Sequence, residues 1–435
     1  MPTYPEVELL RLATVGGVDD GKSTLVGRLL HDSKSLLADH LAAAESASRR
    51  RGRDETDLSL ITDGLRAERE QGITIDVAHR YFATARRRFI LADTPGHVQY
   101  TRNMVTGSST ADLAVVLVDA TRGIVEQTRR HLAVTALLRV PHVVLAVNKM
   151  DLVGFREEVF ASIAERFAAD AAALGVAEVT AIPTSALAGD NVAHPSAAMD
   201  WYGGPTLLEH LETVPCDPRT WSGPARFPVQ SVLLGATPLG VDGPCGRRGY
   251  AGRLESGVLR TGADVVVLPS GQRARIAAID VLGRAADELV AEQSATVYLD
   301  TELDVARGDL IAPVEAAPEP VRSVSGVCCQ VAERPLRPDD RVLLKQGTRT
   351  VPAVVADIPY RLEISAADGP AARREAPGEL RVNEIGAVVL RTTAPVMPDE
   401  YRRIRRTGAF LVIDPADGAT LAAGMAGPAF APGES

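Results

Sequence analysis

Cysteine is scarce in this chain, with 4 among its 435 residues. These are Cys216, Cys245, Cys328 and Cys329, and none of them form a Cys-x-x-Cys pair. A zinc site or a disulfide framework is therefore not expected. A basic surplus is also lacking, because 47 Lys and Arg against 56 Asp and Glu give a formal charge of −9. Proteins that bind nucleic acid usually carry positive charge to neutralise phosphates, so this balance argues against a large RNA or DNA partner.

The sequence also lacks segments that address a membrane. The N-terminus, Met-Pro-Thr-Tyr-Pro-Glu, has no basic region followed by an apolar stretch. No apolar run approaches the roughly 20 residues that span a bilayer. We therefore expect a cytoplasmic protein without membrane contact.

What is present is 46% apolar and 24% charged residues, an ordinary globular composition. At about 150 residues per domain, the length suggests roughly three domains.

The first half of the chain alternates apolar runs with helical stretches. Continuous apolar runs, typical of strands buried on both faces of a parallel sheet, occur at 9–15, 89–93, 113–119 and 143–147. The segments 124–138 and 155–174 have helical character, and the arginines Arg86–Arg88 indicate a hairpin turn. Strand and helix alternating over some 200 residues predict a doubly wound α/β domain at 1–217.

The composition changes after this region. Pro215, Pro218 and Pro224 mark a linker, and the helical pattern ends there. Short segments rich in valine and leucine follow, separated by glycine turns, and a second proline-rich break lies at 312–320. Regular short strands of this kind predict β-barrels. We therefore expect two β-barrel domains, at 223–315 and 321–430.

A phosphate-binding loop follows the first predicted strand. Residues 16–24 read Gly-Gly-Val-Asp-Asp-Gly-Lys-Ser-Thr and satisfy G-x-x-x-x-G-K-[ST], directly before a predicted amphipathic helix. Glycines let backbone N–H groups approach phosphate oxygens, and the helix dipole adds about half a charge. Lys22 would bridge the β- and γ-phosphates, and Ser23 would ligate Mg²⁺. A chance glycine-rich turn is disfavoured by this context. The predicted loop ligands are Gly16, Gly17, Val18, Asp19, Asp20, Gly21, Lys22, Ser23 and Thr24.

A second motif, Asp-Thr-Pro-Gly at 93–96, follows another predicted strand. Asp93 would act on the metal through a bound water, and the N–H of Gly96 would reach the γ-phosphate. Alone, these residues could be an ordinary turn. Their combination with the loop at 16–24 favours a nucleotide site.

A third motif, Asn148-Lys149-Met-Asp151, follows the strand at 143–147 and selects the base. The carboxylate of Asp151 can accept hydrogen bonds from both N1–H and the exocyclic amine of guanine. Adenine offers no such pair of donors, so GTP is expected. Main-chain N–H groups of 185–187 (Ser185, Ala186 and Leu187) would support the base, although this fourth motif could also be a helix N-cap. All four motifs follow strands, where open α/β sheets bind ligands. The sequence therefore predicts an α/β P-loop GTPase domain with a doubly wound, mostly parallel sheet, followed by two β-barrel domains.

The motif Glu-Arg-Glu-Gln-Gly-Ile-Thr-Ile at 68–75, followed by Asp93-Thr-Pro-Gly-His97, resembles the translation-factor class of GTPases. The resemblance implies that Thr74 ligates Mg²⁺ when the γ-phosphate is present. It implies that His97 positions the attacking water, although a lone histidine is often only a buried core residue. Val18 and Ile73 would form an apolar gate in front of His97. Asp19 would help to bind a monovalent cation.

A narrower resemblance is to the GTPase subunits of bacterial ATP sulfurylases. Val-Asp-Asp-Gly-Lys-Ser-Thr-Leu at 18–25 carries it, because elongation factors usually have histidine or serine in place of the second aspartate. Other matching segments are 27–34, 99–104, 109–113, 126–131, 226–230, 249–252, 344–350 and 406–410. Gly17 and Val98 depart from the family pattern, and 234–248 diverges from it.

This resemblance implies a division of labour. A separate subunit of the ATP-pyrophosphatase type would form adenosine 5′-phosphosulfate and pyrophosphate from ATP and sulfate. The GTPase would couple GTP hydrolysis to this reaction. The chain has no Ser-Gly-Gly-x-Asp-Ser loop, so a partner is expected. It has no second P-loop motif, so adenylylsulfate kinase activity is not expected. The alternatives are an elongation-factor-like GTPase that delivers aminoacyl-tRNA, and a nucleotide-dependent scaffold with negligible turnover.

Overall fold

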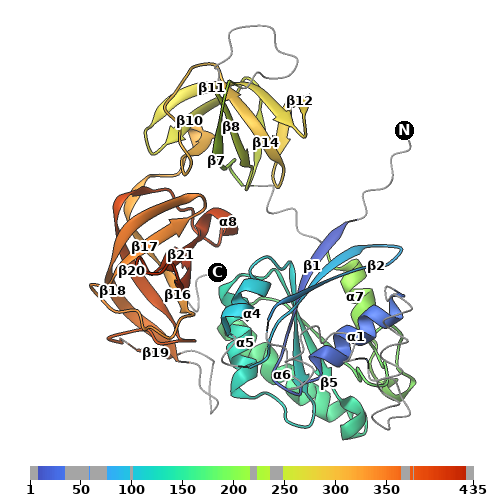
Figure 1. Ribbon diagram of the computed structural model, residues 1–435. Helices are drawn as coiled ribbons and strands as arrows, with labels where there is room; N and C mark the ends of the chain where they lie inside the picture. The colour runs from blue at the N-terminus through green and yellow to red at the C-terminus, as the bar shows by residue number, and fades with distance from the viewer. Residues whose placement is uncertain are drawn as a thin grey trace. The chain divides into compact units, whose positions relative to one another are not determined.

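The computed structural model describes residues 8–34, 58, 76–97, 101–215, 223–235, 248–363, 373–375 and 377–427. The chain divides into two compact units (Figure 1). The first is built mainly from Met1–Cys216, and the second from Asp217–Leu362 with Arg374–Ala429. The predicted domain limits at 217, 223, 315, 321 and 430 stay predictions.

The first unit contains a six-stranded sheet in the order β2-β3-β1-β4-β5-β6. Its strands are β1 (Leu9–Val15), β2 (Ala78–Ala83), β3 (Arg88–Asp93), β4 (Leu113–Asp119), β5 (His142–Asn148) and β6 (Val179–Pro183). All neighbours pair in parallel except β2, which is antiparallel to β3. Every residue of β4 is buried, which explains its continuous apolar run. The expected mostly parallel α/β domain is confirmed.

Helices cover both faces of this sheet (Figure 1). They are α1 (Lys22–Asp32), α4 (Thr101–Ser108), α5 (Glu126–Leu137), α6 (Glu157–Ala173) and α7 (Leu207–Thr213), with the 3-10 turns η3 (Met150–Val153) and η4 (Ala197–Met199). On β4, Val115 packs in the cluster that contains α1 and α7 residues, and Val116 packs in the cluster that contains α5 and α6 residues. Because side chains alternate along a strand, one apolar run supplies two core layers.

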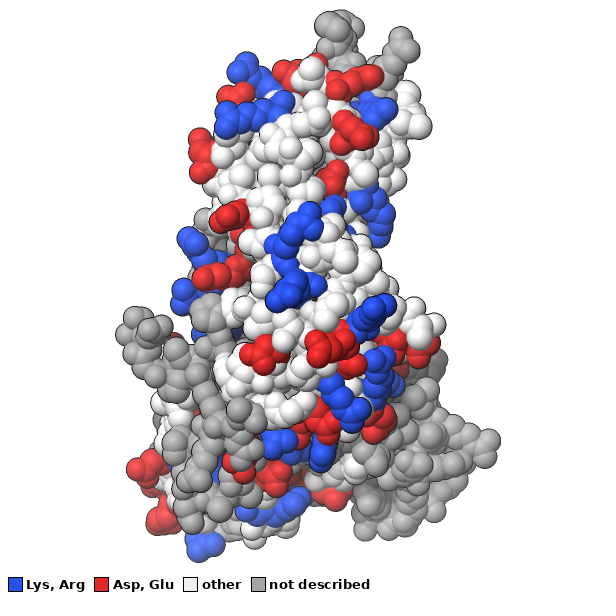
Figure 2. Space-filling view, turned by 90° about the vertical axis from the view of Figure 1, so that its left-hand side faces the viewer, with Lys and Arg blue, Asp and Glu red and all other residues white. Residues whose placement is uncertain are grey.

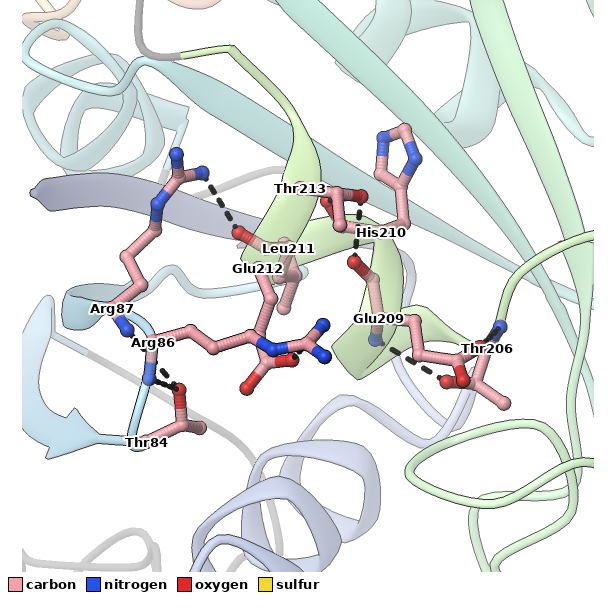
Figure 3. A network of polar contacts seen from close by, with 9 residues as sticks. All are labelled: Thr84, Arg86, Arg87, Thr206, Glu209, His210, Leu211, Glu212 and Thr213. Carbon is pink, nitrogen blue, oxygen red and sulfur yellow. Dashed lines mark hydrogen bonds and ion pairs between the residues drawn. The ribbon is translucent and has the colours of Figure 1, made fainter.

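The β2–β3 hairpin is fastened to helix α7, as Figure 3 shows. The guanidinium of Arg87, 5% exposed, donates to the carbonyls of Leu211 at 3.1 Å and Val214 at 2.5 Å. It also pairs with Glu8 at 2.5 Å. The last carbonyls of a helix have no partner within the helix, so Arg87 satisfies groups that α7 leaves open. The predicted turn at Arg86–Arg88 is confirmed, and its middle arginine is structural.

The second unit begins with a closed barrel. Its elements are β7 (Phe227–Leu234), β8 (Arg248–Arg253), β9 (Val258–Arg260), β10 (Asp264–Leu268), β11 (Gln272–Val281), β12 (Arg284–Ala286), β13 (Glu288–Val290), β14 (Ser294–Leu299), β15 (Leu310–Pro313) and η6 (Val314–Ala316). Six strands follow the order β10-β15-β7-β8-β14-β11, and pairing of β10 with β11 closes the circle. Strands β9 and β13 form a separate pair.

A second closed barrel completes this unit. Its elements are β16 (Val321–Gln330), β17 (Arg341–Gln346), β18 (Arg349–Glu363), β19 (Arg373–Glu375), β20 (Ile385–Val396), α8 (Arg405–Gly408), β21 (Ala409–Ile413) and β22 (Thr420–Ala426). The order β17-β21-β22-β16-β20-β18 is closed by pairing of β17 with β18. The prediction of two β-barrels after the α/β domain is confirmed.

A buried ion pair joins the two barrels within this unit. Arg226, just before β7, donates to both carboxylate oxygens of Asp399 at 2.9 Å. The same guanidinium donates to the carbonyl of Ala316, and Thr407 donates to Asp399. A bidentate pair with further donors fixes both partners.

Charged side chains of both signs are interspersed on the face in Figure 2. Among the described helices, none combines the length and apolar character needed to cross a bilayer.

Candidate nucleotide site

The loop between β1 and α1 has a backbone that requires glycine. Gly21, the residue before α1, has φ of 94°, and a Cβ there would lie 2.4 Å from the side-chain nitrogen of Asn148. No side chain caps α1 at this residue. The N–H groups of the first turn therefore suit an anion such as phosphate.

Charges of both signs are buried in this loop. The N–H of Gly17 donates to Asp20 Oδ2 at 2.5 Å, and Lys22 Nζ donates to the carbonyl of Gly16 at 3.0 Å. Burial raises the pKa of Asp20, although the Gly17 bond and Lys22 oppose this change. Burial lowers the pKa of Lys22 against the opposing effect of Asp93, Asp20 and Asp19. Asp19, expected beside a cation, is exposed.

The Asp-Thr-Pro-Gly motif lies directly against the loop. β3 ends at Asp93, which is 3% exposed and accepts a hydrogen bond from Thr14 at 3.0 Å. A Cβ on Gly96 would lie 2.4 Å from the carbonyl oxygen of Gly16 and 2.5 Å from Lys22 Nζ. Only glycine fits this approach, and the two predicted phosphate motifs are therefore brought together.

The side chain of Asn148, at the end of β5, is hydrogen-bonded to two other segments. Its side-chain nitrogen donates to the carbonyl of Asp20 at 2.8 Å, and its oxygen accepts from the N–H of Ala186 at 2.9 Å. The structure thus gives Asn148 a role in holding the phosphate loop and the 185–187 segment together. Arg28 of α1 adds to this brace by donating to the carbonyls of Ala186 and Leu187. Sequence reasoning did not assign a role to Arg28, because no local pattern reports a contact between such distant residues.

Lys149 is held by a carboxylate that sequence reasoning also missed. Its ammonium lies 2.7 Å from Asp119 at the end of β4. Burial favours the neutral acid of Asp119, but hydrogen bonds from Lys149 and Thr121 outweigh it and lower the pKa. The sequence does place Asp119 at the end of a continuous apolar run, as it places Asp93, and this position could have indicated a role in the site.

Asp151 provides the test of whether guanine fits. Its Oδ1 atom is buried and has no hydrogen-bond partner among the described residues. A buried acceptor without a partner is costly, so it indicates a donor supplied by a ligand. Because the carboxylate follows Lys149 at the carboxyl edge of the sheet, the N1–H and amine of guanine match what it lacks.

The predicted hydrolysis residues are described only in part. His97 is partly exposed and follows Gly96 directly, and Val18 is also partly exposed. Thr74 and Ile73 lie outside the described residues. Ser23 lies in the first turn of α1, as expected. The described residues contain no group of three or more His, Cys, Asp or Glu side chains that could hold a metal by themselves.

The fold and this site define a GTP-binding protein of the translation-factor class. The family described as "Elongation factor Tu GTP binding domain" matches residues 7–216, and "GTP-eEF1A C-terminal domain-like" matches 326–426. With 44% identity over 96% of this chain and 85% of "Sulfate adenylyltransferase subunit 1" of Shewanella oneidensis, the chain belongs to the sulfate adenylyltransferase subunit 1 family. The predicted resemblance is confirmed. Membership of a GTPase family implies GTP and typically Mg²⁺.

Longer relatives are also similar. "Bifunctional enzyme CysN/CysC" of Mycobacterium tuberculosis is 50% identical over 96% of this chain and 67% of its own length. "Bifunctional enzyme NodQ" of Azospirillum brasilense is 48% identical over 96% of this chain and 66% of its own length. The chain thus spans about two thirds of the bifunctional relatives.

Proposed function

We propose that this chain binds and hydrolyses GTP as the GTPase subunit of a heteromeric sulfate adenylyltransferase. The choice of nucleotide is supported by Oδ1 of Asp151, which is buried and has no hydrogen-bond partner among the residues that the structure describes, close in the chain to Asn148. The choice of reaction is supported by the relative named sulfate adenylyltransferase subunit 1. We propose a cytoplasmic location for this activity.

The nucleotide contacts follow from the motifs. The N–H groups of the loop at 16–24 and the ammonium of Lys22 bind the phosphates, and Gly96 faces the γ-phosphate. Asp151 selects guanine, with Asn148, Lys149 and the 185–187 segment forming the rest of the base site. Mg²⁺ held by Ser23, Thr74 and, through water, Asp93 neutralises phosphate charge. We further propose that a monovalent cation binds near Asp19.

Hydrolysis is assigned to His97. Phosphoryl transfer to water needs positioning and charge neutralisation more than covalent chemistry. A histidine next to Gly96 can orient the attacking water, and Val18 with Ile73 forms the gate that limits its access. The stretches 54–76 and 93–104 then respond to the γ-phosphate as switches.

The energy of this step is used by a partner. A separate subunit of the ATP-pyrophosphatase type forms adenosine 5′-phosphosulfate and pyrophosphate from ATP and sulfate. Because that reaction is strongly uphill, coupling to GTP hydrolysis makes product accumulate.

The test is reconstitution with an ATP-pyrophosphatase-type subunit of a heteromeric sulfate adenylyltransferase. Sulfate-dependent release of pyrophosphate from ATP is measured with and without GTP, together with phosphate release from GTP. We expect GTP to raise pyrophosphate release, and ATP with sulfate to accelerate GTP hydrolysis. The matched control is the chain with Lys22→Met, which removes the phosphate-binding ammonium and should abolish both effects.

Equal pyrophosphate release with and without GTP would contradict the proposed coupling. Tight, GTP-dependent binding of aminoacyl-tRNA by the chain would instead support the elongation-factor alternative.

A further inference from the structure

Helix α5 reaches into the nucleotide site through Gln127, in the first turn of the helix. The side-chain nitrogen of Gln127 donates to the carbonyl of Gly96 at 3.3 Å. Gly96 in turn lies against the carbonyl of Gly16 and the ammonium of Lys22. Gln127 therefore contacts Gly96, which packs against the phosphate loop and directly precedes His97. Gln127 itself is not part of any of the four nucleotide motifs.

Gln127 is oriented by a histidine one helical turn away. The same nitrogen lies 2.8 Å from Nε2 of His131, which is 2% exposed. Burial, together with the nearby charges of Lys22 and Arg130, lowers the pKa of His131 to about 3, so the ring is neutral near pH 7. An amide nitrogen only donates, so Nε2 of His131 accepts and its proton resides on Nδ1.

The carbonyl of Gly96 determines the orientation of the amide. This carbonyl can only accept, so the nitrogen of Gln127 faces it, and the reversed amide would place one oxygen against another. With the nitrogen in that place, the neutral ring of His131 accepts through Nε2. Nδ1 of His131 is buried without a partner among the described residues. An apolar residue would avoid that cost, so the ring is better explained by what Nε2 does.

The carbonyl of Gly96 belongs to the peptide group that also contains the N–H of His97. Fixing this carbonyl therefore fixes the direction in which the chain leaves Gly96. We propose that Gln127, oriented by His131, is a positioning residue that places the Gly96–His97 peptide group and thereby His97 for GTP hydrolysis. This inference rests on the proposed function of His97.

A positioning role separates hydrolysis from binding. Among the described residues, no hydrogen bond joins Gln127 to the phosphate loop or to Asp151, so nucleotide affinity should be retained when Gln127 changes. The rate of hydrolysis should fall by about tenfold, the size expected when about one hydrogen bond of positioning energy is lost.

The experiment compares the full-length chain with its Gln127→Leu and Gln127→Glu variants. Gln127→Glu has nearly the same shape but loses the donor. Affinities for fluorescent GDP and a non-hydrolysable GTP analogue are measured by titration, and hydrolysis by single-turnover phosphate release. We expect both variants to bind within about twofold of the wild type and to hydrolyse roughly tenfold more slowly. His131→Gln should give a smaller loss.

The matched control is Glu126→Gln, on the preceding residue of α5, whose carboxylate pairs with Arg130 on the exposed side of the helix. This variant should bind and hydrolyse GTP like the wild type. Unchanged hydrolysis in both Gln127 variants would overturn the inference. Equal losses of affinity and hydrolysis would also overturn it, because they would show a structural role. Failure of the wild-type chain to bind guanine nucleotides would contradict the proposed function itself.

Discussion

Neighbouring residues of the base site differ in whether other residues of the protein already fill their hydrogen-bonding capacity. Lys149 is already paired with Asp119, and Asn148 makes hydrogen bonds to two other segments. Asp151 alone of these three retains a buried acceptor without a partner among the described residues. Lys149 and Asn148 therefore shape the site, and Asp151 has the free hydrogen-bonding capacity that can select a base.

Replacing this carboxylate should change which base is bound. Asp151→Asn is expected to weaken GTP binding about a hundredfold, because a charge-assisted bond of about 3 kcal/mol is lost. The asparagine amide would donate to the C2 carbonyl of xanthine, so xanthosine triphosphate should bind the variant better than GTP does. Competition titrations with both nucleotides measure this exchange. A variant that still prefers GTP would contradict the assignment of Asp151.

His131 should make folding stability depend on pH. Its folded pKa, about 3, lies below the ordinary value of 6.5, so the unfolded chain takes up the proton first as the pH falls. The contribution is fully present above about pH 6.5 and is lost progressively toward pH 3, by about 2 kcal/mol at pH 5. Urea unfolding at pH 8 and pH 5 measures it. His131→Gln should lose less stability between these pH values than the wild type, and equal losses would contradict the prediction.

At the scale of elements, the sequence predicted those features that are local. The limits 113–119 coincide with β4 because every residue of that strand is buried, and the loop at 16–24 joins β1 to α1 as expected. Contacts between distant elements were not predicted. Gln127 meets Gly96 across 31 positions and Arg28 meets Ala186 across 158, and no periodicity or motif records such pairs.

The hairpin between β2 and β3 offers a comparison of two adjacent arginines. Arg87→Met should destabilise the first unit by about 3 kcal/mol, because two carbonyls at the end of α7 lose a charged donor. Arg86→Gln should cost less than about 0.5 kcal/mol, because the Arg86 side chain is largely exposed and its contact with Glu212 is a single one at 3.4 Å. Thermal unfolding of both full-length variants measures the difference. Similar melting temperatures for the two would show that the buried bonds of Arg87 matter less than their geometry indicates.

At the scale of the whole molecule, the buried ion pair between Arg226 and Asp399 is among the contacts that join the two barrels. Arg226→Met leaves Asp399 without its bidentate partner, so we expect a loss of about 3–5 kcal/mol in the second unit. The double variant Arg226→Met with Asp399→Leu should recover much of this loss, since no buried charge remains. Denaturant unfolding of the wild type, the single variant and the double variant provides the test. A single variant as stable as the wild type would contradict it.

The anchoring of α7 by Arg87 has a mechanical consequence. β2 follows the 54–76 stretch, and α7 is the last helix that the structure describes before β7. Tension applied to the chain just beyond Val214 would act on its hydrogen bond with the guanidinium of Arg87 and so on the β2–β3 hairpin. The end of α7 is thus bound to the hairpin whose first strand, β2, follows the proposed switch at 54–76. A pull from the barrels and a change at the γ-phosphate could therefore act on the same hairpin from opposite ends.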